Sequence, residues 1–403
     1  MVDPSRVRVS GPLESYASGF VVELASEGYR PLPAAYQLRL MAHLSRWLAG
    51  EGLEPADLSA AAVGEFLAAR RAAGYRTLCS PRALEPSLEY LRGMGVVPAE
   101  PAVVACTAVD VLLERYRCYL LSERGLAAVT VRGYADMVRP FLAGRAAAGG
   151  LDLEQLRPGD VTAFVLAECP GRASGSAKLL VTALRSFLGF LHVAGVLEES
   201  LTVAVPSVAG WRLAGLPRGL ERGEARRLLA GCDRRTTVGR RDFAILSLLA
   251  RLGLRRGEVA RLELGDVDWR AGELVIRGKG NRQERLPLPV DVGEAVVGYL
   301  RRGRPSSAQG RCVFVRVKAP HRALTPGGVT QVVVSAARRA GLGEVTAHRL
   351  RHTAATEMLR AGATLPEIGQ VLRHRSLLTT AIYAKVDREA LRSLARPWLG
   401  GVA

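Results

Sequence analysis

The residues best suited to chemistry lie in one stretch near the C-terminus, residues 346–385. His348 and Arg351 stand one helical turn apart, and an isolated tyrosine, Tyr383, follows nine residues after His374. Three of the six histidines of the chain fall in this stretch. Guanidinium groups bind phosphate oxygens and imidazoles move protons, so this combination predicts a site that acts on a phosphate group.

Local signals place the first two of these residues on a helix. Thr346 is suited to cap its N-terminus, and Gly362 supplies the left-handed residue after its last turn. His348 and Arg351, at positions i and i+3, then share one face of this helix.

Two further helices are expected to carry the rest of the stretch. Thr364 and Glu367 form a capping box that opens a second helix, which runs out at His374. Ser376 then starts a third helix, and this helix carries Tyr383.

An upstream segment, residues 240–287, adds two more candidates. An apolar helix over 244–252 is terminated by Gly253, and Arg255 lies in the connection before a short helix. The sequence GELVIRGKGNRQERLPLP then predicts two short strands around a turn that presents Lys279 at its tip. The chain has few lysines against a large excess of arginine, which makes this lysine conspicuous.

The order of these residues resembles that of the tyrosine recombinases, the phage-integrase and Xer family of site-specific DNA recombinases. The resemblance rests on GLRRGE around Arg255, the GKGNRQERLPL hairpin, HRLRH, and LRHRSLLTTAIY. Six positions occur in the family's order, each in the expected secondary structure. One departure is visible, because Arg373 stands before His374 where a glycine is usual. That larger side chain is expected either to shift His374 or to add a phosphate contact.

The resemblance implies a role for each residue. The nucleophile is Tyr383, which forms a 3′-phosphotyrosyl link, and Arg255 and Arg351 clamp the phosphate. A lysine can donate a proton as arginine cannot, so Lys279 protonates the leaving 5′ oxygen. The remaining roles fall to two histidines: His348 assists proton transfer at the tyrosine, and His374 hydrogen-bonds the phosphate. No metal or nucleotide cofactor is expected, because the phosphotyrosine keeps the energy of the broken bond.

Structural explanations compete with these roles when the residues are taken singly. Arg255 alone would be a surface arginine, His348 and His374 would be histidines at helix ends, and Tyr383 would lie on a helix surface. Taken jointly, a chance placement of the whole set is improbable. Two neighbours are left out of the site for the same structural reasons: His352, expected to support the fold, and Glu258, expected to be a structural partner.

Charge is distributed unevenly along the 403-residue chain. The net charge is +18, yet residues 1–105 hold 10 basic and 11 acidic side chains, and residues 106–205 hold 10 of each. Residues 206–403 hold 36 basic and 17 acidic side chains, so the last half is expected to bind a polyanion such as DNA. The six scattered cysteines, without a C-x-x-C pair, argue against a disulfide framework or zinc site and are expected to be reduced packing residues.

The first half contains an internal repeat. RWLAG at 46–50 matches PFLAG at 140–144, and LEYLRGMGV at 88–96 matches LGFLHVAGV at 188–196. Each copy is expected to form a small all-helical unit, of which the second resembles the family's core-binding domain. For the first copy two roles stay open, a further DNA-contacting module or a protein-contact module, and near-neutral charge slightly favours the latter.

The predicted fold is mainly α with a small antiparallel β-sheet: two all-helical SAM-like N-terminal domains plus an α+β catalytic domain. Four segments are predicted, and they are an N-terminal helical domain (1–105), a core-binding DNA-clamp domain (106–205), a linker (206–217) and the catalytic domain (218–403). Within the last, residues 311–318 are a candidate third strand. The tail after Tyr383 is expected to form an amphipathic helix that docks on a neighbouring subunit or on its own domain.

The predicted activity is site-specific recombination or integration of DNA for a mobile genetic element. The resemblance implies double-stranded DNA sites and a homotetrameric synapse as partners, with companion recombinases as an option. Neither a signal peptide nor an 18-residue apolar run is evident, which predicts a cytoplasmic protein without a membrane partner. Two alternatives stay open: a type IB topoisomerase-like DNA relaxing enzyme, or a catalytically silent DNA-binding protein.

Overall fold

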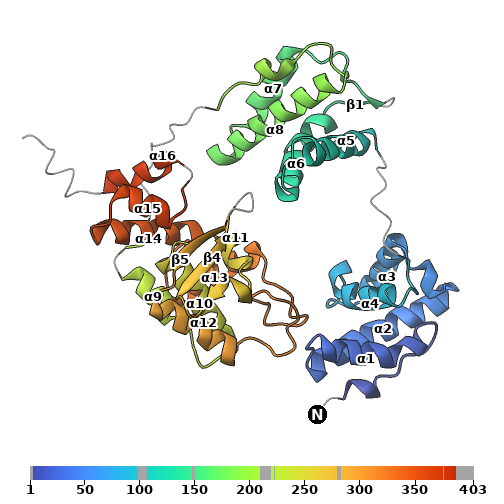
Figure 1. Cartoon of the computed structure of the whole chain (residues 1–403). Helices are drawn as coiled ribbons and strands as arrows, with labels where there is room; N and C mark the ends of the chain where they lie inside the picture. The colour runs from blue at the N-terminus through green and yellow to red at the C-terminus, as the bar shows by residue number, and fades with distance from the viewer. Residues whose placement is uncertain are drawn as a thin grey trace, which may run out of the picture. The chain divides into compact units, whose positions relative to one another are not determined.

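The computed structural model describes residues 3–98, 107–147, 150–208, 219–221, 223–278, 283–374 and 376–386 (Figure 1). By its internal contacts the chain divides into two compact units, one of residues 101–214 and one that combines 1–100 with 215–403. The predicted domain boundaries at 105 and 217 fall outside the described residues, as do most of the linker and Cys106. Those boundaries therefore stay predictions.

The first hundred residues form a helical bundle with its own apolar core. Gly52, at φ 68°, ends the longest of its helices, and the Ser59 hydroxyl accepts the backbone N–H of Ala62 at the start of the next. Three short 3₁₀ turns accompany the helices. The elements are η1 (Pro4–Arg6), η2 (Glu14–Tyr16), α1 (Ala17–Ser26), α2 (Pro31–Glu51), η3 (Pro55–Asp57), α3 (Ala60–Ala72) and α4 (Pro81–Gly93).

Residues 107–208 form a second helical bundle around a separate core. Its elements are α5 (Ala108–Ser122), α6 (Ala128–Ala143), a two-stranded ribbon of β1 (Ala146–Ala147) and β2 (Gly150–Leu151), α7 (Pro158–Glu168), α8 (Ser174–Val193) and η4 (Leu201–Ala204).

The two bundles bury corresponding positions, as an internal repeat requires. One hundred residues apart, α4 and α8 bury matching positions, namely Leu84, Ser87, Leu88 and Leu91 in α4 and Leu184, Phe187, Leu188 and Leu191 in α8. Ninety-eight residues apart, α3 buries Val63 and Leu67 where α7 buries Val161 and Val165. The sequence repeat therefore coincides with a repeat of core positions.

By length and composition, α8 is apolar enough to cross a membrane, with a mean hydropathy of 1.2. The sequence-based expectation concerned a continuous apolar run, and Lys178 and Arg185 interrupt this helix. Half of this helix is buried, and side chains such as Leu184, Phe187 and Leu191 belong to the core of the bundle. Its apolar character is accounted for by the core that it fills.

The predicted catalytic domain, here called the catalytic part and described from residue 219 on, combines helices with a small antiparallel sheet of strand order β3-β4-β5. The elements up to the sheet are α9 (Glu224–Ala230), α10 (Thr237–Arg251), α11 (Arg256–Ala260), η5 (Leu264–Asp266), β3 (Val267–Asp268), β4 (Glu273–Arg277) and β5 (Gln283–Pro287). After the sheet come α12 (Val290–Arg302), α13 (Pro326–Arg339), α14 (Ala347–Arg360), α15 (Leu365–Val371), α16 (Leu377–Thr380) and η6 (Ala381–Val386). The mainly α fold with a small antiparallel sheet is thus confirmed.

The third strand was misassigned. Residues 311–318 form only isolated bridges, Glu263 with Cys312 and Val315 with Ala323, and the third strand of the sheet is β3. Val313 and Phe314 are buried, so their apolar character reflects the core rather than a ladder.

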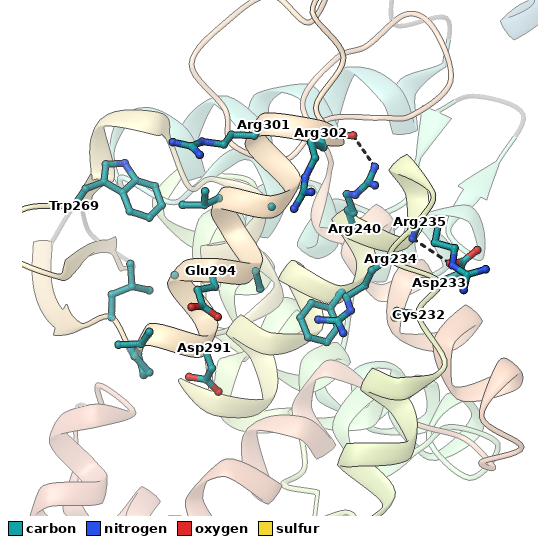
Figure 2. A pocket seen from close by; sticks show the side chains of 18 of the residues that line it. Cys232, Asp233, Arg234, Arg235, Arg240, Trp269, Asp291, Glu294, Arg301 and Arg302 are labelled. Atoms are coloured by element: carbon teal, nitrogen blue, oxygen red, sulfur yellow. Dashed lines mark hydrogen bonds between the residues drawn. The ribbon is translucent and has the colours of Figure 1, made fainter.

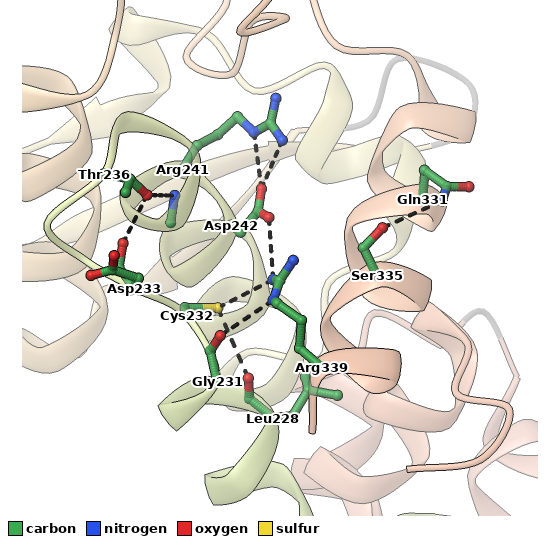
Figure 3. A network of polar contacts seen from close by, with 11 residues as sticks. Leu228, Gly231, Cys232, Asp233, Thr236, Arg241, Asp242, Gln331, Ser335 and Arg339 are labelled. Carbon is green, nitrogen blue, oxygen red and sulfur yellow. Dashed lines mark hydrogen bonds and ion pairs between the residues drawn. The ribbon is translucent and has the colours of Figure 1, made fainter. Parts of the chain in front are cut away.

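A polar network fastens α10 to its neighbours (Figure 3). Asp242, buried in α10, pairs with Arg241 at 2.7 Å and with Arg339 of α13 at 3.4 Å. The Nε of Arg339 also donates to the carbonyl of Gly231, which follows α9, at 3.2 Å. The Asp242 carboxylate and the Arg339 guanidinium therefore tie α10, α13 and the end of α9 together.

The cysteines differ in their exposure. Among the described residues five are free, and Cys232 is buried while Cys118 lies exposed on α5. The expectation that the cysteines are packing residues therefore fails for Cys118.

Candidate active site

Arg255 lies at the N-terminus of α11, in the turn after α10. Gly253, at φ 59°, makes this turn possible, as the sequence predicts. The backbone N–H and the Nη1 of Arg255 both donate to the Glu258 carboxylate, at 2.8 and 2.7 Å. Its side chain is 47% exposed. Part of the guanidinium is therefore fixed by the protein and part faces solvent.

Arg351 is buried in α14, behind Arg255. Its Nη1 donates to the carbonyl of Gly253 at 2.5 Å, and its Nη2 donates to the carbonyl of Leu372. Burial, with the charges of Arg255 and Arg373 adding to it, lowers the pKa of Arg351 to about 10, so it remains cationic at neutral pH. Arg351 thereby joins the turn after α10 to the end of α15.

Tyr383 lies in η6, with its ring inside a small apolar cluster that includes Ala355, Ile368 and Leu372. It is buried, and its hydroxyl lies 2.8 Å from Nδ1 of His352. Burial raises the pKa of Tyr383 to about 12 despite the positive charge of Arg351. The residue bonded to the phenol is therefore His352, which the sequence-based site left out.

Of the remaining histidines, His374 lies beside Tyr383 and His348 lies beside His352. The ring of His374 is stacked parallel to that of Tyr383 at 6.5 Å, and its Nδ1 lies 2.7 Å from Oγ1 of Thr380. His348 packs edge-on against His352, with ring centroids 4.3 Å apart, and its side chain is exposed. Desolvation, with the arginine charges, lowers the pKa values of all three histidines, to about 4 for His352 and His374. All three are therefore neutral at pH 7.

Arg373 is buried and paired within the protein. It adopts φ 55°, a left-handed conformation, and its Nη2 donates to the buried carboxylate of Glu258 at 2.8 Å. Burial pushes the pKa of Glu258 upward, but Arg373 and then Arg255 outweigh it, and the net pKa is lowered. Of the two expectations for Arg373, a new phosphate contact finds no support, and His374 still lies beside Tyr383.

Five of the six predicted residues therefore belong to one electrostatically coupled cluster: Arg255, His348, Arg351, His374 and Tyr383. Lys279 lies outside the described residues, in the segment between β4 and β5. The predicted tail helix also lies outside them. Within the described residues, no group of three or more His, Cys, Asp or Glu side chains could hold a metal ion.

A second surface feature lies apart from this cluster. A groove of about 1430 Å³ runs along α12 and the loop between α9 and α10, and none of the five predicted site residues that the structure describes lines it. Figure 2 shows Arg240 of α10 beside Arg302 of α12, whose carbonyl its Nη1 bonds at 2.9 Å. Carboxylates and apolar side chains share the walls with these arginines.

The chain matches two family models. Residues 218–390 match the model described as the phage integrase family, and residues 113–195 match that of the phage integrase N-terminal SAM-like domain. The first 112 residues lie outside both matches.

Similar proteins of known sequence cover from about three quarters to nearly all of the chain. A protein named as an integrase/recombinase, y4rA of Sinorhizobium fredii, is 42% identical over 97% of this chain and 95% of its own length. The tyrosine recombinase XerD of Mycobacterium tuberculosis is 34% identical over 72% of this chain and 96% of its own length.

Solved structures share the fold. XerH bound to its palindromic difH substrate in a post-cleavage complex aligns with a TM-score of 0.56 and 19% identity, over 82% of this chain and 93% of its own. A lambda integrase tetramer bound to a Holliday junction aligns with a TM-score of 0.53 and 16% identity, over 82% and 90%.

The fold and the matched family model are those of a tyrosine-type DNA strand transferase. Given its full-length similarity to y4rA and the match of its catalytic part, the chain belongs to the phage integrase family of tyrosine recombinases.

Proposed function

We propose that this protein is a site-specific integrase that cuts and rejoins DNA strands through Tyr383. The observation that carries the proposal is the gathering of two arginines, three histidines and one tyrosine around the contact between α14 and η6. This arrangement provides a nucleophile, cationic phosphate ligands and proton carriers within one cluster.

In the proposed reaction, the phenol oxygen of Tyr383 attacks the scissile phosphorus. A P–O bond to Tyr383 forms as the bond to the 5′ oxygen breaks, and this oxygen leaves as a hydroxyl with a proton from Lys279. The phenolic proton passes to His348. A 5′ hydroxyl of a second strand then attacks the phosphotyrosine in the reverse sense, which restores the phenol without a nucleotide cofactor.

The two arginines have different parts in this proposal. Arg255 is held at Nη1 by Glu258 and at Nη2 by the carbonyl of Arg373, at 3.3 Å, and offers the exposed part of its half-exposed side chain to the non-bridging oxygens. Arg351 is buried, and it contributes a positive charge to the site while the carbonyls of Gly253 and Leu372 fix its orientation. Removal of one such preorganised donor typically slows a reaction about 100-fold or more. A neutral His374 retains one ring N–H for the same phosphate.

We propose that the described conformation of Tyr383 is an inactive one. A base with a pKa of about 4, such as His352, does not deprotonate a phenol with a pKa of about 12. Since the phenol is also buried, we propose that DNA binding displaces residues 376–386 and moves Tyr383 away from His352 toward the arginines.

The wider context is also a proposal. DNA-bound dimers and tetramers among the structural neighbours support an assembly of several copies on two duplex sites. The integrase/recombinase names of relatives such as y4rA support a role in moving a genetic element. Because the substrate is DNA and the relatives are bacterial, we propose that the protein acts in the cytoplasm.

The direct test compares Tyr383→Phe with the unaltered chain on a nicked suicide substrate built from the DNA junctions that flank the gene. The unaltered chain is expected to form a covalent protein–DNA adduct, while the variant binds the same DNA and forms none. Adduct formation by Tyr383→Phe would show that another residue is the nucleophile.

A further inference from the structure

The N-terminal bundle, which neither family model covers, holds a cluster of carboxylates and a separate cluster of basic and aromatic side chains. Glu23, Glu27 and Glu89 interact electrostatically on the side formed by α1 and α4. The side formed by α2 and α3 instead gathers basic and aromatic side chains, here called the α2–α3 patch: Tyr36, Arg39, His43, Arg46, Arg70 and Tyr75. The total charge of this region is therefore near neutral although carboxylates and arginines gather locally within it.

The α2 half of the patch is one continuous helical stripe. Tyr36, Arg39, His43 and Arg46 are spaced by three and four residues, so they share a face. Arg39 lies over the ring of Tyr36 at 5.6 Å, and Arg46 lies 3.3 Å from Nδ1 of His43. Desolvation, then the charges of Arg46 and Arg70, lower the pKa of His43. The stripe thus presents two arginines, one beside an aromatic ring and one beside an imidazole.

Arg70 of α3 is the central residue of the patch. It is 8% exposed, and its guanidinium lies 4.1 Å from the ring centroid of Tyr75. Its Nε and Nη1 have no hydrogen-bond partner, and its Nη2 reaches only the Thr77 carbonyl at 3.5 Å. Within the described residues no carboxylate pairs with it. A buried charge without a counter-ion costs free energy, and an arriving anion would offset that cost.

The second bundle shows that this patch is particular to the first. Ninety-eight residues after Arg70 stands Glu168, whose carboxylate is paired with Arg172 at 2.5 Å. Ninety-four residues after His43 stands Met137, whose sulfur lies 3.9 Å from the same Arg172. The corresponding position of the second bundle therefore holds an ion pair between Glu168 and Arg172, whereas in the first bundle Arg70 has no carboxylate partner among the described residues.

We propose that the α2–α3 patch binds the phosphate backbone of duplex DNA, which makes the N-terminal bundle an additional DNA-binding module. Guanidinium groups match phosphate oxygens, and the exposed Tyr36 and Tyr75 offer flat surfaces to sugars and bases. This inference departs from the sequence-based preference for a protein-contact module. It does not depend on the catalytic roles assigned above.

The first experiment measures the affinity of the full-length protein for a random-sequence duplex of sixty or so base pairs at several salt concentrations. Arg39→Gln combined with Arg46→Gln removes two phosphate ligands from the patch. The logarithmic slope of affinity against salt is expected to become shallower by about 1.8, because each phosphate contact contributes about 0.9. Arg30→Gln combined with Arg82→Gln is the charge-matched control from the same bundle, and its slope is expected to change less.

The second experiment uses Arg70→Met, which keeps a side chain long enough to lie against Tyr75. If Arg70 binds DNA, this variant is expected to bind DNA more weakly. Its thermal midpoint is expected to be unchanged or raised, because an unpaired buried charge has been removed. A lowered midpoint with unaltered DNA affinity would show that Arg70 is only structural. That outcome, or equal slopes for the patch and control variants, would overturn the proposal.

Discussion

At the scale of single residues, the contact between His352 and Tyr383 distinguishes the site from its sequence-based prediction. Residue types and spacing sufficed to find Arg255, Arg351, His374 and Tyr383, because the six-residue order is shared by the family. Which histidine of α14 reaches the phenol depends on where η6 packs, and this is tertiary information. The only local signal for His352 was its position directly after Arg351 in HRLRH.

The histidines make the stability of the catalytic part depend on pH. His352 and His374 have pKa values of about 4 in the folded chain, against an ordinary value of 6.5. As pH falls, these histidines are protonated in the unfolded chain at a higher pH than in the folded chain. Their contribution to the free energy of unfolding is therefore complete above pH 6.5 and is lost as pH falls toward 4. We expect the thermal midpoint to fall between pH 7 and 5, and to fall less in His352→Gln, whose amide does not titrate. An identical decline in that variant would show that His352 is not one of the groups responsible.

Arg373 stabilises the site through Glu258 rather than through substrate. Arg373→Gly relieves the left-handed backbone, by about 1–2 kcal/mol, but leaves the buried Glu258 carboxylate with Arg255 alone. Breaking a buried ion pair typically costs about 3–5 kcal/mol. The loss of the ion pair outweighs the relief of the backbone, so we expect chemical denaturation to show that the free energy of unfolding falls by about 2 kcal/mol.

A matched double variant tests this explanation. Glu258→Gln combined with Arg373→Gly leaves no buried carboxylate without its partner. It is expected to recover part of the lost free energy of unfolding. If Arg373→Gly alone were more stable than the unaltered chain, the backbone term would dominate instead.

At the scale of elements, caps and turns were predictable because they depend on neighbouring residues. The Thr346 and Thr364 hydroxyls accept the backbone N–H groups that the sequence assigns to them, and Gly362 is left-handed. The strand predicted over residues 311–318 was wrong because strand formation depends on residues that are distant in the sequence. A β-prone sequence forms a strand only where tertiary structure supplies a partner, and here it supplies only isolated bridges.

The turn at Gly253 positions both arginines of the site. Its φ of 59° favours glycine, its carbonyl accepts from Arg351, and an added Cβ would lie 2.5 Å from a methyl carbon of Leu372. Gly253→Ala is therefore expected to lower the free energy of unfolding by about 1–2 kcal/mol or more. Adduct formation is also expected to slow, because the turn that aims Arg255 must shift.

Gly272→Ala provides the comparison. It has a similar φ of 65° but open space around the added methyl group, and it lies in the turn before β4. It should lose stability while adduct formation by the folded protein is retained. Equal effects on adduct formation would mean that the turn at Gly253 has no special part in the site.

At the scale of the whole molecule, the repeat and the division of charge were evident from the sequence, whereas the patch on the first bundle was not. Counting charges gives a near-neutral N-terminal region, and only the fold shows that some of its carboxylates and some of its arginines gather in separate clusters. Arg70 in particular looks ordinary in a sequence. Its burial and its unpaired nitrogens arise from the packing of α3 against its neighbours.

The central claim is that Tyr383 becomes covalently joined to DNA. The most direct measurement digests the trapped protein–DNA adduct and locates the modified residue by mass spectrometry. The account predicts a nucleotide on the hydroxyl of Tyr383, attached through its 3′ phosphate. A nucleotide on another residue, or attachment through a 5′ phosphate, would contradict it.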